Sequence, residues 1–297
     1  MQWSGVFPAL TTKFTNQDTL DIPMFVRNID KQIEAGVHGI ILGGTLGEAS
    51  TLTRSEKETL VKTSLEKAGN KIPVILNIAE GSTNEAIRQV ALAETWGVNG
   101  LMLLPPMRYG PDHRELVTYF RTVARSTKLP IMIYNNPVDY KTEVTLDAFD
   151  ELQSETNIQA VKESTRDVSN VVRMKNRFGN RYSVLCGVDT LALESFCVGA
   201  DGWVAGLVCA FPKETMALYN LAKAGSFSQA LALYQWFLPL LELDIRPKLV
   251  QYIKLAEQSQ GIGTEYVRAP RLTLEGEERQ AVLQIIQRAV ENRPAVT

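Results

Sequence analysis

The chain has 297 residues, with 31 lysines and arginines against 33 aspartates and glutamates, and 45% of its residues are hydrophobic. A formal charge of −2 argues against a nucleic-acid-binding protein, whose basic residues cluster. The chain lacks an apolar run of about 18 residues and a charged leader before an apolar core, so we expect neither a membrane span nor a secretory signal. Three cysteines and two histidines without metal-ligand spacing argue against a zinc site or a disulfide framework. We therefore expect a soluble, cytoplasmic protein.

Eight short apolar runs recur along the first two thirds of the chain. Nearly unbroken runs of this length are typical of strands that are buried on both faces, as in parallel sheets. The runs are residues 5–10, 39–42, 73–78, 100–104, 130–134, 158–161, 183–186 and 202–207.

The segments between these runs place apolar residues three and four apart, which predicts amphipathic helices, for example over 22–33, 86–93 and 116–123. Eight alternating strand and helix units predict an α/β fold, specifically a (β/α)8 TIM barrel. An open dinucleotide-binding sheet is less favoured, because no G-x-G-x-x-G follows the first run.

The last quarter of the chain shows helical periodicity over 227–243, 248–258 and 274–289 and no strand pattern. We therefore expect a catalytic barrel over 1–223 and a three-helix C-terminal extension over 224–297, packed on the barrel because the linkers are short. Arg268 and Arg271 flank a proline in this extension, where surface ion pairing is the default expectation.

The polar residues at the carboxyl ends of the strands are the candidates for chemistry in such a barrel. Lys162, directly after run 158–161, stands out because burying an ammonium group without a partner is costly. Its position leaves two interpretations open. Lys162 either pairs with Glu163 or lies in solvent beyond the barrel, or it is a desolvated amine. An amine shielded from water loses its proton more readily and can form an imine with a ketone.

Two further strand ends carry residues suited to the same chemistry. Tyr134 ends the preceding run and either caps the barrel core or transfers protons beside the amine. The turn Gly-Gly-Thr-Leu-Gly-Glu at 43–48 is either a tight connection or a cradle whose backbone N–H groups bind an anion.

Four short motifs follow one another along the chain, and in them the sequence resembles the dihydrodipicolinate synthase and N-acetylneuraminate lyase family of class I, Schiff-base aldolases. The resemblance spans essentially the whole chain, including the helical extension. The motifs are the turn at 43–48, Ile-Tyr-Asn-Asn-Pro at 133–137, Ala-Val-Lys-Glu-Ser at 160–164 and Cys-Gly-Val-Asp at 186–189.

The resemblance implies three catalytic residues. Lys162 would attack the ketone of a pyruvate-type 2-oxo acid, Tyr134 would transfer protons beside the imine, and Thr45 would pass protons to Tyr134. The chemistry would need no cofactor and no metal, and the family usually forms homotetramers.

The resemblance also implies residues that bind the substrate. The backbone of Leu46 and Gly47 would hold the carboxylate, and Gly187 and Val204 would line the imine pocket.

The chain departs from typical members of the family at three places. Leu46 replaces a second threonine in the glycine turn. Asp139 aligns with an arginine that, in dihydrodipicolinate synthases proper, binds the carboxylate of the second substrate. Arg108 aligns with a tyrosine that joins the proton relay of a neighbouring subunit, and Tyr109 follows one position later. Either Tyr109 rebuilds that relay, or Arg108 binds a distal anionic group.

These departures argue against a lysine-biosynthesis synthase, since Asp139 would repel a dicarboxylate. The leading hypothesis is a lyase that cleaves or condenses a 2-oxo acid by aldol chemistry through the Lys162 imine. One alternative uses the same imine to remove water or ammonia from a 2-keto-3-deoxy sugar acid or a hydroxylated pyrroline carboxylate, and Tyr140 beside Asp139 would suit a hydroxylated substrate. Another is a barrel that binds a 2-oxo acid without catalysis.

Overall fold

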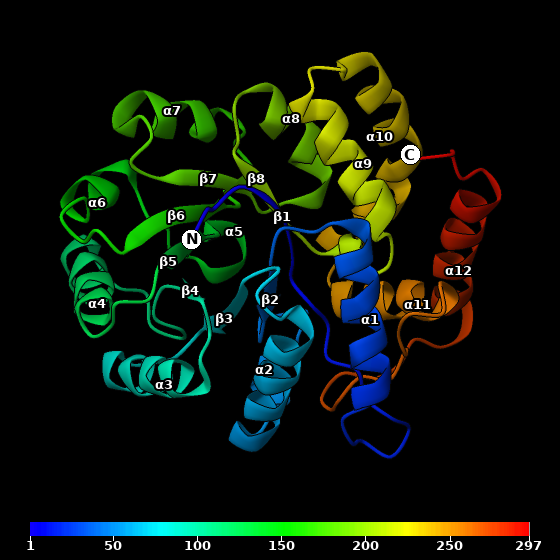
Figure 1. Cartoon of the computed structure of the whole chain (residues 1–297), viewed down its shortest axis with the longest axis horizontal. Coiled ribbons are helices and arrows are strands. Elements are labelled where there is room, and N and C mark those ends of the chain that lie inside the picture. The colour runs from blue at the N-terminus through cyan, green and yellow to red at the C-terminus, as the bar shows by residue number, and fades with distance from the viewer. Residues whose placement is uncertain (297) are drawn as a thin grey trace.

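The computed structural model describes residues 1–296 and contains a sheet of eight parallel strands at its centre (Figure 1). Each of the eight apolar runs coincides with one strand, so the predicted strand positions are confirmed, although β5 and β6 extend one and two residues beyond their runs. The strands are β1 Gly5–Pro8, β2 Ile40–Leu42, β3 Val74–Ile78, β4 Gly100–Leu103, β5 Ile131–Asn135, β6 Ile158–Glu163, β7 Ser183–Cys186 and β8 Gly202–Ala205.

The strands close into a nearly complete barrel. Their order is β1-β8-β7-β6-β5-β4-β3-β2, every paired neighbour is parallel, and a parallel bridge between Ala9 and Ile41 joins the segment after β1 to β2. The predicted (β/α)8 TIM barrel is therefore confirmed. Side chains of the strands fill the interior; Phe7, Ile41 and Val161, for example, are fully buried.

The helices of the barrel surround the strands, and local capping residues fix where several of them begin. Thr53 starts α2 and Asp112 starts α4 with capping boxes, in which the side chain of the cap and a glutamate three residues later bond each other's backbone N–H. The helices are α1 Ile22–Ala35, α2 Arg54–Ala68, α3 Thr83–Trp96, α4 His113–Arg125, α5 Pro137–Tyr140, α6 Leu146–Glu151, α7 Ser169–Phe178, α8 Ala192–Cys197 and α9 Pro212–Lys223.

The C-terminal helices α10 Phe227–Leu241, α11 Leu249–Ser259 and α12 Gly276–Glu291 lie at one side of the barrel, beside α1 and α9 (Figure 1). A 3₁₀ turn, η4 Glu242–Ile245, links α10 to α11. Within residues 1–296 no helix has the length and apolar character needed to cross a lipid bilayer.

Two fully buried ion pairs connect α11 to the mouth of the barrel. Lys254 Nζ lies 2.8 Å from Glu48 Oε1, and Lys13 Nζ lies 2.8 Å from Glu257 Oε1; all four side chains have no solvent exposure. Burial lowers the pKa of Lys254 to about 8, while the neighbouring Glu48 carboxylate opposes this shift. Arg268 donates its backbone N–H to Glu48 at 3.0 Å. Its guanidinium pairs with Glu56 and with the exposed Asp18, as expected, but is itself only 12% exposed.

Replacing one partner of such a pair should strongly destabilise the fold, because the other charge stays buried. We expect Lys254→Met to lower the free energy of unfolding by about 3–5 kcal/mol. Lys31→Met is the matched control. It breaks an exposed pair with Glu34 and should cost less than about 1 kcal/mol. Urea denaturation of both variants measures the free energy of unfolding. Equal values for Lys254→Met and Lys31→Met would contradict the stabilising role of the buried ion pair.

Candidate active site

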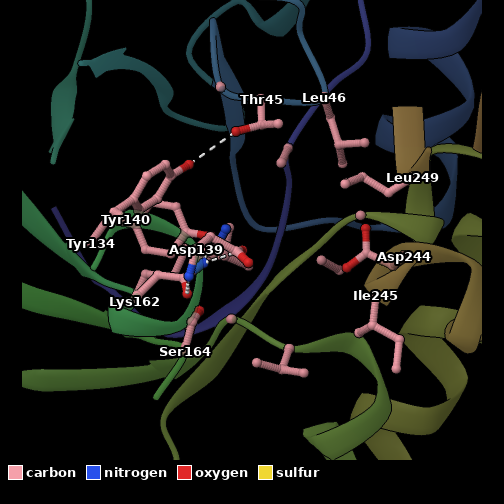
Figure 2. A pocket seen from close by; sticks show the side chains of 18 of the residues that line it. Thr45, Leu46, Tyr134, Asp139, Tyr140, Lys162, Ser164, Asp244, Ile245 and Leu249 are labelled. Atoms are coloured by element: carbon pink, nitrogen blue, oxygen red, sulfur yellow. Dashed lines mark hydrogen bonds between the residues drawn. The ribbon is translucent and has the colours of Figure 1, made fainter. Parts of the chain in front are cut away.

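A cavity of about 380 Å³ opens at the carboxyl ends of the strands (Figure 2). The turn after β2, the ends of β5 to β8 and the segment from η4 to α11 all contribute to its wall. Of the residues predicted for the site, the cavity is lined by Thr45, Leu46, Tyr134, Asp139, Lys162, Gly187 and Val204.

Lys162 is part of β6 and is 8% exposed, so it is neither solvated nor beyond the barrel. Successive side chains of a strand point to opposite faces, and the neighbouring Glu163 is turned away from the cavity. The Glu163 carboxylate accepts hydrogen bonds from Thr165 N and Asn170 Nδ2, both at 2.7 Å. The Lys162 ammonium instead lies 4.0 Å from the centroid of the Tyr134 ring. The structure thus favours the desolvated amine over the pair with Glu163.

The absence of a side chain at Gly187 leaves room for the Lys162 side chain in the cavity. A Cβ on Gly187 would lie 2.7 Å from Lys162 Cγ and 2.8 Å from its Cε, and would overlap Ser164 Oγ. The Ser164 hydroxyl is buried and has no hydrogen-bond partner among residues 1–296. The site therefore needs a residue without a side chain beside the lysine stem.

Tyr134 leaves β5 next to the lysine, and the short helix α5 follows it directly. Its hydroxyl accepts a hydrogen bond from Asn136 Nδ2 at 3.0 Å, and the same amide donates to Asp139 Oδ2 at 2.8 Å. Because the phenol oxygen is held as an acceptor, its own proton is free to point into the cavity.

Thr45 contacts Tyr140 rather than Tyr134. The Thr45 and Tyr140 hydroxyls lie 3.0 Å apart, and the ring of Tyr140 packs edge-on against the ring of Tyr134 with centroids 5.5 Å apart (Figure 2). Burial, followed by the neighbouring Tyr134, raises the pKa of Tyr140. Two phenols and one hydroxyl therefore meet beside Lys162 within one chain.

The remaining predicted residues lie outside this cavity. Gly47 packs behind the turn, where its carbonyl accepts a hydrogen bond from Thr12 Oγ1 at 2.7 Å. Arg108 is exposed, in a left-handed backbone conformation, and lines a neighbouring hollow. Tyr109 is 57% exposed and donates its hydroxyl to Glu115. The structure does not bring Arg108 or Tyr109 to Lys162 of the same chain.

Two carboxyl groups lie beside Gly206 near the β8 end of the cavity, Asp189 buried behind the wall and Asp244 lining it. Asp189 is fully buried and accepts hydrogen bonds from Trp203 Nε1 at 2.9 Å and from the backbone of Gly206 and Leu207. Asp244, in η4, lines the cavity from the extension. Burial and the charge of Asp189 raise the pKa of Asp244 well above its usual range. Sequence reasoning missed Asp244, because no local pattern connects residues after α10 to the barrel mouth.

Among residues 1–296, no group of three or more histidine, cysteine, aspartate or glutamate side chains is arranged to hold a metal ion. The ionisable groups that line the cavity are one amine, two phenols, the carboxyl groups of Asp139 and Asp244, and the guanidinium groups of Arg166 and Arg246.

A (β/α)8 barrel with a buried lysine beside a phenol at its mouth is the arrangement of imine-forming lyases of the class I aldolase type. The sequence matches the model of the dihydrodipicolinate synthetase family over residues 2–289, and the chain belongs to this family. It is an enzyme of the lyase class.

Named relatives and solved structures agree with this assignment. The chain is 32% identical over 275 residues, 92% of each sequence, to 4-hydroxy-tetrahydrodipicolinate synthase of Exiguobacterium sibiricum. The crystal structure of dihydrodipicolinate synthase from Aquifex aeolicus superposes with a TM-score of 0.91 at 28% identity, covering 96% of this chain and 98% of that one. The crystal structure of dihydrodipicolinate synthase from Acinetobacter baumannii in complex with pyruvate superposes with a TM-score of 0.91 at 25% identity. The match covers 97% of this chain and 99% of that one.

The close packing at Gly187 can be tested by Gly187→Ala. The added Cβ should displace the Lys162 side chain and reduce its reaction with a 2-oxo acid about 100-fold, the effect of a misplacement of about 1 Å. Gly110→Ala, where a Cβ meets nothing within 4 Å, is the control. The rate of borohydride-trapped adduct formation with pyruvate is measured by mass spectrometry, and circular dichroism verifies folding. A folded Gly187→Ala protein that is trapped at the wild-type rate would show that Gly187 does not position Lys162.

Proposed function

We propose that the chain is a lyase that forms an imine between Lys162 and the ketone of a pyruvate-type 2-oxo acid. The observation that carries this proposal is the burial of the Lys162 amine 4.0 Å from the Tyr134 ring, inside a cavity large enough for a small acid. The protonated imine acts as an electron sink, so a proton can leave carbon 3 and give an enamine. The enamine then supports either aldol cleavage and condensation or elimination.

Tyr134, Tyr140 and Thr45 form the proposed proton relay. The Tyr134 hydroxyl, fixed by Asn136, transfers protons at the imine, and Tyr140 links Tyr134 to Thr45. In this scheme Tyr140 supplies, from the same chain, the second phenol that the sequence led us to seek in Tyr109.

The substrate carboxylate is proposed to bind the turn after β2. The backbone N–H groups of Leu46 and Gly47 donate no hydrogen bond to another atom of residues 1–296, which leaves them available for an anion. The Leu46 side chain is 5% exposed and offers no hydroxyl, so main-chain donors would carry this role alone.

Asp139 lines the cavity at the position that aligns with the carboxylate-binding arginine of the synthases, and it would repel a second carboxylate placed beside it, although Arg166 and Arg246 also belong to the wall. We therefore propose that the second substrate or leaving group differs from that of the synthases after which the relatives are named. Hydroxylated acids of the 2-keto-3-deoxy sugar acid or hydroxypyrroline carboxylate type fit Tyr140 and the carboxyl groups of Asp139 and Asp244. A barrel that only binds 2-oxo acids is disfavoured, because such binding would need no relay beside the lysine.

We further propose a homotetrameric assembly, as the family resemblance implies. Arg108 and Tyr109, which are exposed in the single chain, would then be available to a neighbouring subunit. Sedimentation equilibrium measures this state.

The imine can be trapped directly. Borohydride added with pyruvate should reduce the imine and attach the three-carbon acid irreversibly to Lys162, as located by peptide mass spectrometry. Lys162→Ala should show no adduct, and Lys175→Ala, which removes a lysine paired with Asp201, should be labelled at Lys162 like the wild type. An unchanged mass of the wild type after treatment with several 2-oxo acids would refute the proposed function.

The relay can be tested without knowledge of the second substrate. The imine exchanges the methyl protons of pyruvate with deuterated water, which proton NMR follows. Tyr134→Phe and Tyr140→Phe should each slow this exchange about 100-fold or more, because each removes a proton-transfer group. Tyr266→Phe, a change at an exposed tyrosine of the extension, is the control. If Tyr109→Phe slows the exchange and Tyr140→Phe does not, the relay comes from a neighbouring subunit.

A further inference from the structure

The side-chain amide of Asn136 connects Tyr134 to Asp139. Its Nδ2 donates to the Tyr134 hydroxyl at 3.0 Å and to Asp139 Oδ2 at 2.8 Å, and its Oδ1 accepts the backbone N–H of Asp139 at 3.2 Å. Asn136 is only 5% exposed, whereas Asp139 is exposed and lines the cavity on the side of Tyr134 (Figure 2). Both hydrogens and the oxygen of this buried amide are therefore bonded within the protein.

The sequence Asn-Pro-Val-Asp at 136–139 explains this arrangement locally. Asn136 caps α5, Pro137 takes the first helical position and Asp139 the third, so the cap accepts the N–H of Asp139 in the usual way of N-cap residues. In a capping box the third residue directs its side chain back to the backbone of the cap. Asp139 instead directs its carboxylate to the side-chain amide of the cap, which in turn contacts Tyr134.

The two contacts with Asp139 fix which end of the Asn136 amide faces Tyr134. An ionised carboxylate only accepts hydrogen bonds, and a backbone N–H only donates them. Turning the amide by half a rotation would place its carbonyl against the carboxylate and its NH₂ group against the N–H. Both hydrogen bonds would then be replaced by repulsive contacts, so the NH₂ end is held toward Tyr134.

The direction of this hydrogen bond decides what the Tyr134 phenol can do. Because Asn136 donates, the phenol oxygen is the acceptor, and no other hydrogen bond within residues 1–296 engages the phenol proton. The proton stays available to a substrate bound at Lys162, whose Nζ lies 4.0 Å from the centroid of the Tyr134 ring. A reversed amide would accept the phenol proton through its carbonyl and withhold it from the substrate.

We propose that Asp139 is a positioning residue, which acts through Asn136 to keep the Tyr134 proton available to the imine-forming substrate. This inference rests on the imine chemistry and on the role of Tyr134 in the proposed function. It also assigns a use to a position at which the chain departs from the synthases. An arginine at position 139 would offer only donors and could not accept a hydrogen bond from the Asn136 amide.

The same hydrogen bond serves both proton transfers at Tyr134. Lys162 and the ketone first give a carbinolamine, whose hydroxyl takes the Tyr134 proton and leaves as water while the nitrogen lone pair forms the C=N bond. The resulting phenolate is stabilised by the Asn136 N–H, because a hydrogen bond to a charged acceptor is stronger than one to a neutral acceptor. The phenolate then takes a proton from carbon 3, which gives the enamine and restores the phenol.

The exchange of pyruvate methyl protons with deuterated water isolates this role, since it needs the imine and Tyr134 but no second substrate. Asp139→Leu removes the acceptor at similar side-chain volume. It should lower kcat for exchange about 10-fold, the effect of one lost hydrogen bond, with little change in KM for pyruvate. Asp139→Asn keeps an oxygen that accepts from Asn136 and should stay within about 3-fold of the wild type. Asp30→Leu, a change at a surface aspartate, is the control.

Asn136→Asp tests the direction of the hydrogen bond. Aspartate keeps the helix cap but replaces the NH₂ group with an oxygen that accepts the Tyr134 proton, so exchange should fall about 100-fold. In the Tyr134→Phe background, Asp139→Leu should cause no further loss, because a residue that acts through Tyr134 has no effect once the phenol is gone. Circular dichroism and the final amount of borohydride-trapped pyruvate verify that each variant is folded and keeps a reactive Lys162.

Three results would overturn the inference. Undiminished exchange in Asp139→Leu or Asn136→Asp would show that the hydrogen bonds are dispensable. A loss in Asp139→Asn equal to that in Asp139→Leu would show that the charge of Asp139 matters and not its acceptor oxygen. A further loss on adding Asp139→Leu to Tyr134→Phe would show that Asp139 acts directly on the substrate. A wild type that traps no pyruvate would instead refute the imine itself.

Discussion

The buried ion pair between Lys254 and Glu48 is the constraint on which the architecture of the site depends. Glu48 directly follows the glycine turn, and Lys254 lies in α11, so the pair fixes the extension to the turn that carries Thr45. Neither charge has access to water, and separating them would leave two uncompensated ions in a medium of low dielectric constant. The cavity wall that contains Asp244 is therefore set in a fixed position relative to the strands.

This constraint divides the cavity into two chemically different walls. The strand side carries Lys162 and Tyr134, the residues to which the proposed mechanism assigns the imine and the proton transfer. The extension side carries a carboxyl in apolar surroundings. Gly187 and Gly206 have the same steric role on the two walls. Because neither has a side chain, Lys162 packs against the backbone of Gly187 and Asp244 against that of Gly206.

The barrel was predictable from the sequence because parallel strands are buried on both faces and appear as continuous apolar runs. Lys162 was predictable as a candidate because an ammonium group next to such a run is costly to bury. The hydrogen bond from the Arg268 backbone to Glu48 could not be predicted, because it joins residues 220 positions apart and no local pattern encodes it. The contacts of Tyr140 with Thr45 and Tyr134 were equally hidden, because they depend on where α5 places the Tyr140 ring.

Leu46, one of the departures from the family, and Asp244 of the extension both pack against Gly206. A leucine in the glycine turn removes a hydroxyl from the proposed carboxylate site, and its Cδ1 packs toward Gly206. On the other side of Gly206, burial and the charge of Asp189 raise the pKa of the Asp244 carboxyl, so the wall opposite Lys162 carries a carboxyl that ionises less readily than a surface one. The turn and the extension therefore meet at one glycine, and a change in either one alters the wall that the rest of a Lys162-bound acid would face.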